Sequence, residues 1–269
     1  MDRPTEARNP RAKALSSLST RDLLELMNDE DATVPGAVRD ALPEIERAVG
    51  IVTDALAKGG RLRYVGAGTS GRLGVLDASE APPTFGVEPE LVHGIMAGGD
   101  AALRRSIEGA EDDGGMGERD ARAVLRPGDV LVGISASGRA RYVLAAIAAA
   151  KAVGARRVAV TCDPGSPLAR DAEVAIVLRV GPEILAGSSR LKAGTATKLT
   201  LNMLSTAAMV KLGRTKGDLM IDMRPVSDKL RERAIRIVRE ETGVDEAEAR
   251  RRLDATGWDV RAVIESRAR

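Results

Sequence analysis

The chain has 269 residues, 43% of them hydrophobic, and its 41 basic and 39 acidic residues leave a net charge of +2. One Trp, two Tyr and one Phe are too few to build a base-stacking platform, and the charges are interleaved, so we expect no nucleic-acid partner. A single cysteine, Cys162, and a single histidine argue against a disulfide and a metal site, and the absence of an apolar run long enough for a membrane span or a signal peptide predicts a cytoplasmic protein without a membrane partner.

The first 58 residues predict helices. Ser19 or Thr20 can cap a helix whose apolar face begins at Leu23, and a second helix is expected from about 35 to 58, ended by two glycines. These helices are expected to pack on the segment that follows.

From residue 61 onward, short apolar strands alternate with helical patterns. The clearest helix covers 139–154, and the strands are expected at 61–66, 91–97, 129–135, 156–162 and 174–180. This alternation predicts an α/β fold with a doubly wound parallel sheet whose two faces are covered by helices.

Only helices are expected after the last strand. A long helix rich in small residues should cover 189–212, another 227–241, and the tail predicts two short helices broken at Gly257. We therefore expect an N-terminal helical segment at 1–58, the sheet domain at 59–222 and a C-terminal helical region at 223–269.

The first strand ends in a glycine pattern, Gly66, Gly68 and Gly71, that taken alone suggests a dinucleotide-binding loop. In that fold an acidic residue about 20 positions further on holds the ribose. Here the acid that follows the second strand, Asp100, comes about 29 residues after Gly71. A nicotinamide cofactor is therefore not expected.

Hydroxyl groups in two strand-to-helix loops favour a smaller phosphate ligand. Thr69 and Ser70 follow the first strand, and Ser135 and Ser137 follow the third. Both loops leave the sheet at its carboxyl edge, where backbone N–H groups and helix dipoles favour an anion. The alternative is that these hydroxyls only cap helices.

Carboxylates near these loops are candidates for acid/base chemistry. Glu80 lies close to the expected end of the first sheet helix, because Pro82 disfavours helical geometry at the residue before it. The segment 104–115 offers further acids, among which local sequence does not choose, and a plain surface glutamate remains the alternative at each position. His93 and Cys162 are expected to be structural.

Several long motifs resemble one family, the N-acetylmuramic acid 6-phosphate etherases, which are sugar-isomerase (SIS) domain enzymes of peptidoglycan recycling. The motifs are "GAGTSGRLGVLDASEAPPTFG", "IEGAEDD", "GPEILAGSSRLKAGTATKLTLNMLSTAAMVKLG" and "GDLMIDM". The resemblance implies a three-layer fold with a five-stranded sheet, a homodimer with its site near the subunit interface, and a small UBA-like tail. It also implies a lyase without cofactor or metal that releases D-lactate from its sugar phosphate substrate and leaves N-acetylglucosamine 6-phosphate.

The resemblance also implies roles for particular residues. Its two catalytic glutamates fall on Glu80 and Glu111. Contacts to the sugar phosphate are implied for Gly68, Thr69, Ser70, Gly71, Arg72, Ser135, Ser137, Gly138, Arg139, Ser189, Lys192 and Lys198. The second loop departs from the family pattern at Ala140, which lacks a hydroxyl group, and Ala81 replaces a more common cysteine.

Three other functions share parts of this pattern. A sugar-phosphate-binding regulatory protein, similar to the glucokinase regulator, would need the two loops but not the carboxylates. A phosphosugar isomerase would remove the same C2 proton without releasing lactate. A DNA-binding regulator would need a helix-turn-helix ahead of the sheet, whereas the first sixty residues predict packing helices.

Overall fold

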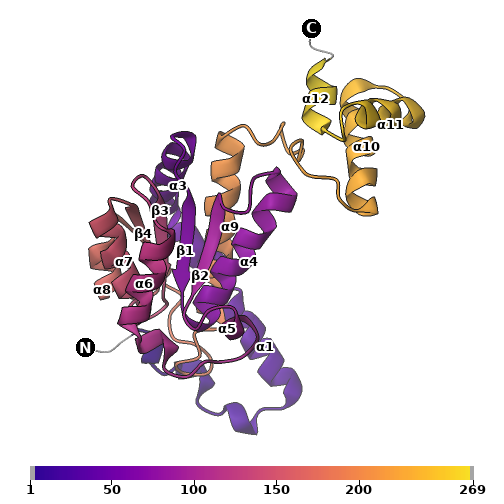
Figure 1. Ribbon diagram of the computed structural model, residues 1–269. Coiled ribbons are helices and arrows are strands. Elements are labelled where there is room, and N and C mark those ends of the chain that lie inside the picture. The colour runs from indigo at the N-terminus through magenta and orange to yellow at the C-terminus, as the bar shows by residue number, and fades with distance from the viewer. Residues whose placement is uncertain (1–3, 267–269) are drawn as a thin grey trace.

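The computed structural model describes residues 4–266 and has a five-stranded parallel sheet at its centre (Figure 1). The strand order is β2-β1-β3-β4-β5. All five predicted strands are confirmed, as are the α/β class and the doubly wound arrangement. The strands are β1 (Leu62–Gly66), β2 (Val92–Met96), β3 (Val130–Ile134), β4 (Arg156–Thr161) and β5 (Val174–Val177).

Helices precede, connect and follow the strands. The α-helices are α1 (Thr20–Asp31), α2 (Val34–Asp40), α3 (Leu42–Ala57), α4 (Gly68–Phe85), α5 (Ala101–Arg104), α6 (Gly114–Val124), α7 (Arg141–Val153), α8 (Pro167–Asp171), α9 (Lys192–Lys211), α10 (Asp228–Thr242), α11 (Glu246–Ala255) and α12 (Val260–Glu265). Short 3-10 helices lie at η1 (Pro4–Glu6), η2 (Pro10–Ala12), η3 (Leu15–Ser17) and η4 (Ala110–Asp112).

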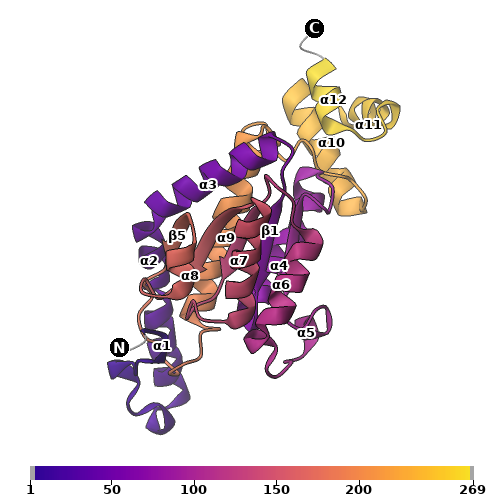
Figure 2. The same ribbon diagram turned by 60° about the vertical axis from the view of Figure 1, so that its left-hand side comes forward.

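The helices form two layers on opposite faces of the sheet (Figures 1 and 2). Helices α2, α3, α4 and α9 enclose one aliphatic core with one face, and α6, α7 and α8 enclose a second core with the other. The central strands β1 and β3 are buried along their whole length, as expected for parallel strands covered on both sides. The molecule therefore has the three layers that the sequence predicted.

Two helix predictions were wrong, and proline accounts for both differences. The helix expected from 35 to 58 is two helices that meet at Ala41, because Pro43 fits the first turn of a new helix but not the interior of a longer one. Helix α4 continues through Pro82 and Pro83 to Phe85, and the Gly86 N–H then donates to the Pro82 carbonyl over 2.9 Å. Glu80 consequently lies more than one turn before the end of α4, not close to it as predicted. At that distance the partial negative charge of the helix C-terminus has little effect.

Helices α10, α11 and α12 surround a small core of their own. This third cluster includes Ile221 and Met223 from the preceding segment, and Trp258 packs against it. In Figures 1 and 2 the three helices stand beyond one end of the sheet. The break expected at Gly257 is confirmed, since α11 ends at Ala255 and α12 begins at Val260.

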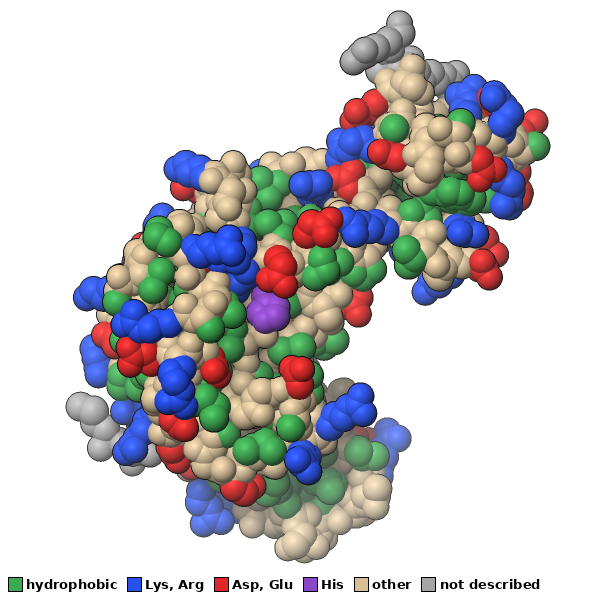
Figure 3. Space-filling view, viewed as in Figure 1, with side chains coloured by type: hydrophobic (Ala, Val, Ile, Leu, Met, Phe, Trp, Pro, Cys, Tyr) green, Lys and Arg blue, Asp and Glu red, His purple; other side chains and the backbone are tan. Residues whose placement is uncertain are grey.

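The surface carries mixed charge. Figure 3 shows basic and acidic side chains interspersed over the visible face, in keeping with the near balance of the two types in the sequence. Among residues 4–266, no helix is both long enough and apolar enough to cross a membrane.

Candidate active site

A cavity of about 260 Å³ lies at the carboxyl edge of the sheet, where β1 and β3 are neighbours. This is the switch point of the doubly wound sheet, since the chain runs outward from it in both directions, and ligands bind at such points. The cavity is lined by Thr5, Glu6, Ala67, Gly68, Thr69, Ser70, Glu111, Ile134, Ser135, Ala136, Ser137, Ala140, Gly187 and Ser189. Seven of the residues predicted to form the site are therefore brought together here.

Two helices begin at this cavity without a side-chain cap. The N-cap residues are Ala67 for α4 and Ala140 for α7, and neither supplies a capping hydrogen bond. The first N–H groups of a helix have no partner within the helix and carry its positive dipole end. The open N-termini thus offer donors to an anion, and the alternative that the loop hydroxyls only cap these helices is wrong.

Glycines allow β1 and α4 to meet at a sharp turn. A Cβ atom on Gly66 would lie 2.5 Å from the Gly71 nitrogen, and one on Gly71 would lie 2.7 Å from the Gly66 oxygen. Between them Gly68 has a φ of +53°, in the left-handed region. The glycine pattern therefore brings the first turn of α4 close to the strand end, with Gly71 behind the cavity rather than in its lining.

The hydroxyl groups of the cavity are available as donors to a ligand. Ser135 Oγ accepts the Gly138 N–H at 3.1 Å, and Ser137 Oγ accepts the Arg139 N–H at 3.3 Å. Within residues 4–266, five of the hydroxyl groups in the lining donate to no acceptor in the protein, namely those of Thr69, Ser70, Ser135, Ser137 and Ser189. Such a set of neutral donors suits the oxygens of a phosphate group.

A smaller chamber of about 190 Å³ adjoins this cavity. The two share Ala67, Gly68 and Glu111, so the Glu111 carboxylate lies where they meet. The remaining lining of the chamber comes from Arg72, Met96, Ala97, Ala102, Ser106, Ile107, Glu108, Gly109 and Ala110. Arg72, which was predicted to contact the sugar phosphate, therefore lies in the second chamber.

The sequence did not point to the residues that cover the cavity. Thr5 and Glu6 come from η1, and Gly187 lies in the loop before α9 beside Ser189. Residues 5 and 187 approach one another only in the folded chain. Thr5 belongs to none of the motifs, and Gly187 lies within one of them two residues before the predicted Ser189. Glu6 adds a second carboxylate to the cavity beside Glu111.

A buried polar cluster holds this cover in place. Lys192, which is 3% exposed, donates to Glu30 over 2.6 Å, and Asn9 donates to the same oxygen over 2.8 Å. The carboxylate of Glu183 accepts the first two N–H groups of α9, those of Lys192 and Ala193. Lys192 is thus committed to an ion pair outside the cavity, and the cluster ties the N-terminal segment to the loop that carries Ser189.

The charge state of Glu30 follows from these contacts. Burial opposes its ionisation, but the hydrogen bond and the charge of Lys192, with help from Asn9 and Arg11, outweigh burial and hold the pKa of Glu30 below its ordinary value of 4.5. The ion pair is therefore fully formed at neutral pH.

Glu80 is exposed on α4 and does not line the cavity. Ten residues separate it from Ser70 along the helix, which corresponds to roughly 15 Å. One turn earlier, Asp77 is buried and accepts hydrogen bonds from Tyr64, Asn202 and Ser205, which join α4 to α9. Burial raises the pKa of Asp77, and these hydrogen bonds oppose that shift. Within one chain the two predicted catalytic glutamates are thus not brought together.

The other predicted contacts also lie outside the cavity lining. Gly138 is buried at the second loop with a φ of +63°, and Arg139 pairs with Asp163 at 3.2 Å. Lys198 is exposed on α9. Cys162 is buried as expected, and burial, with a smaller effect of Glu183, raises the pKa of its thiol to about 12.

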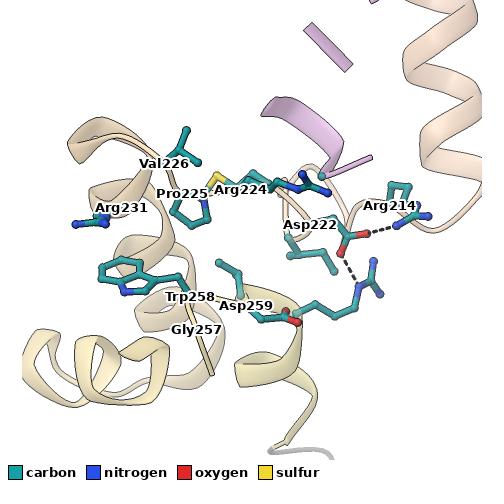
Figure 4. A pocket seen from close by; sticks show the side chains of 14 residues that line it. Arg214, Asp222, Arg224, Pro225, Val226, Arg231, Gly257, Trp258 and Asp259 are labelled. Atoms are coloured by element: carbon teal, nitrogen blue, oxygen red, sulfur yellow. Dashed lines mark hydrogen bonds and ion pairs between the residues drawn. The ribbon is translucent and has the colours of Figure 1, made fainter. Parts of the chain in front are cut away.

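A larger cavity, about 780 Å³, lies between the end of α4 and the C-terminal helices (Figure 4). Arg214 and Arg261 both pair there with Asp222, at 3.4 and 2.6 Å, and Arg231 lies 5.3 Å from the centre of the Trp258 ring. Its cations are therefore largely engaged with neighbouring side chains, and the two hydroxyl-bearing turns lie elsewhere. The chemistry of a sugar phosphate site favours the smaller cavity at the sheet edge.

Sequence comparisons identify the family of the chain. Residues 44–151 match the glucokinase regulatory protein N-terminal SIS domain, and residues 114–208 match the SIS domain. The chain is 52% identical over 261 residues to N-acetylmuramic acid 6-phosphate etherases of Yersinia pestis and Yersinia pseudotuberculosis. The matched region covers 97% of this chain and 88% of each relative.

Solved structures share the fold at lower identity. A phosphoheptose isomerase from Neisseria gonorrhoeae is similar over 71% of this chain and 98% of its own, with a TM-score of 0.54 and 20% identity. A putative sugar-phosphate isomerase from Listeria monocytogenes is similar over 73% and 94%, with a TM-score of 0.53 and 15% identity. These likenesses support the SIS-type architecture of the sheet and its helices.

Proposed function

The chain belongs to the N-acetylmuramic acid 6-phosphate etherases, enzymes that cleave a carbon–oxygen ether bond, and we propose that its cavity at the β1–β3 switch point binds the sugar phosphate. The observation that carries the proposal is the convergence of two uncapped helix N-termini and five hydroxyl donors on one cavity that also holds Glu111. The phosphate is bound between the two turns, and the sugar extends toward Glu111.

The reaction needs proton transfers and no redox step. With the sugar in its open-chain form, a carboxylate removes the proton at C2, beside the aldehyde carbonyl. The C3–O bond then breaks, and its electron pair leaves with the lactate oxygen, which takes up a proton. Water adds to the resulting double bond at C3 while a proton returns to C2. The sum is substrate plus water giving N-acetylglucosamine 6-phosphate plus D-lactate.

The position of Glu80 bears on the oligomeric state. A rise of about 1.5 Å per residue keeps the Glu80 carboxylate far from the phosphate turn of its own α4, whereas Glu111 lines the cavity. Large apolar side chains are exposed on α4 and on the adjoining α9: Leu76, one turn before Glu80, is 52% exposed, and Met203 is 37% exposed. We propose that these helices pack against a second copy of the chain in a homodimer, so that Glu80 of one copy completes the site of the other.

The function is tested by D-lactate release from N-acetylmuramic acid 6-phosphate, with a chelator present and without nicotinamide. We expect release by the wild type and a loss of at least about a hundredfold in both Glu111→Gln and Glu80→Gln, because each removes one acid/base group. Glu118→Gln is the control, since Glu118 is exposed on α6 and pairs only with Arg122, and it should retain full activity.

Other outcomes would favour the other functions. A wild type that binds the sugar phosphate without releasing lactate would overturn the etherase proposal in favour of a regulatory protein, for which the matched SIS domain of the glucokinase regulator is the precedent. Conversion between aldose and ketose phosphates without lactate would indicate an isomerase. A cytoplasmic location is part of the proposal, and the single buried thiol, Cys162, is compatible with a reducing compartment.

A further inference from the structure

The second chamber contains a cation that the phosphate site does not use. Arg72 extends from the second turn of α4 into this chamber, which meets the main cavity at Glu111. Its Nε and Nη2 donate to the carbonyls of Ala102, Leu103 and Arg105, at 2.7 to 3.4 Å. These contacts fix the guanidinium group at the end of the short helix α5.

The charge of this guanidinium group is not neutralised by an acid. Among residues 4–266, no carboxylate lies within ion-pair distance of Arg72, although Glu108 and Glu111 line the same chamber, and no hydrogen bond is made by its Nη1. A guanidinium held by carbonyls on one edge keeps donors for a carboxylate on the other.

One part of the chamber wall is apolar. Met96 and Ala102 are nearly fully buried, and Ile107 is partly exposed, with all three in the lining. The chamber thus combines one cation and a small hydrophobic wall with the carboxylates of Glu108 and Glu111. A lactyl group has the matching chemistry, since its central carbon carries a carboxylate and a methyl group.

Resting on the function proposed above, we propose that the second chamber is the subsite for the leaving group and that Arg72 binds the carboxylate of the lactyl ether. With the phosphate bound between the two turns, the reacting carbons lie near Glu111, and the ether substituent enters the chamber beyond it. The lactyl methyl packs on Met96, Ala102 and Ile107. Arg72 then determines specificity for a substrate that carries the lactyl acid, in contrast to phosphosugars that lack it.

The test compares two ligands that differ only in the lactyl group. Arg72→Met is measured for KM with N-acetylmuramic acid 6-phosphate and for the inhibition constant of N-acetylglucosamine 6-phosphate. We expect KM to rise about ten- to a hundredfold, the usual effect of losing a charged hydrogen bond, while the inhibition constant stays within about twofold. Arg72→Lys should recover part of the affinity, and Arg104→Met, an exposed arginine of α5, should change neither constant.

Two results would overturn the proposal. Equal rises in both constants would mean that Arg72 supports the phosphate turn. No change in either constant would mean that Arg72 does not contact the substrate. If the lyase activity itself were absent, equilibrium binding of the two ligands by wild type and Arg72→Met would still decide the question. If the wild type binds N-acetylmuramic acid 6-phosphate more tightly than N-acetylglucosamine 6-phosphate and Arg72→Met does not, the subsite is supported even without the reaction.

Discussion

The contacts of a single residue determine what it can do at the site. Lys192, the first residue of α9, is a natural phosphate ligand by sequence, yet its side chain is buried against Glu30. The serines of the second loop accept N–H groups of the turn, which leaves their own hydroxyl hydrogens available to a ligand. The type of a residue therefore predicts which chemistry it could perform. Contacts with residues distant in the sequence determine which lysine or serine is available for it.

Glu30→Gln tests the buried cluster. The substitution leaves the Lys192 charge without its partner, so we expect a loss of about 3–5 kcal/mol of unfolding free energy at neutral pH. Because the folded-state pKa of Glu30 is lowered, the stabilisation by the wild-type carboxylate is present above about pH 4.5 and is lost as the pH falls through the folded-state value. The difference in unfolding free energy between the wild type and Glu30→Gln should therefore become smaller in acid.

Urea denaturation at pH 7 and at a pH well below 4.5 measures this effect. Glu25→Gln provides the control, because Glu25 pairs with Arg21 on the exposed side of α1 and should matter little at either pH. A difference in unfolding free energy between the wild type and Glu30→Gln that grows in acid would contradict the account.

At the scale of elements, the phosphate turn depends on the contact between β1 and α4. Gly71→Ala places a methyl group against the Gly66 carbonyl, and we expect a loss of roughly 1–3 kcal/mol of stability together with weaker binding of N-acetylglucosamine 6-phosphate. Gly50→Ala is the matched control, since Gly50 lies in α3 with no neighbour within 4 Å and should stabilise the helix slightly.

Thermal unfolding and calorimetric titration of both variants follow the two effects. Unchanged ligand affinity in a folded Gly71→Ala variant would mean that the first turn of α4 does not form the phosphate site. Loss of stability in Gly50→Ala would instead question the packing of α3.

The elements themselves were largely predictable because their signals are local. Short apolar stretches that alternate with helical patterns located β1 to β5, and the hydroxyl-bearing turns after β1 and β3 located the ligand-binding edge of the sheet. The cover of the cavity was not predictable, since Thr5 and Gly187 meet only after the chain folds. Helix α4 passes its two prolines because packing of Ala81 and Phe85 into the core outweighs the local preference.

On the scale of the whole molecule, the C-terminal helices form a separate core. We propose that residues 223–269 unfold as their own unit, with Ile221 as an anchor from the preceding segment. Leu253→Ala should cost this unit about 2–5 kcal/mol, because Leu253 is fully buried in it. The only tryptophan, Trp258, reports on the unit by fluorescence.

For Leu253→Ala we expect a lower midpoint of the thermal transition followed by Trp258 fluorescence. At temperatures below that transition, the KM for the sugar phosphate substrate should be unchanged. Leu201→Ala, in the main core on α9, should lower the stability of the sheet domain instead. A large change of KM in Leu253→Ala would mean that the C-terminal helices contribute to the site.

The central claim is that an etherase site forms from Glu111 of one copy and Glu80 of another. Its most direct test mixes the inactive Glu80→Gln and Glu111→Gln proteins, dissociates and reassembles them, and measures D-lactate release. If the site is shared, each mixed dimer has one intact site, so random reassembly should restore about a quarter of the wild-type activity. Mixed dimers, verified by mass spectrometry, that release no more lactate than either variant alone would contradict the account.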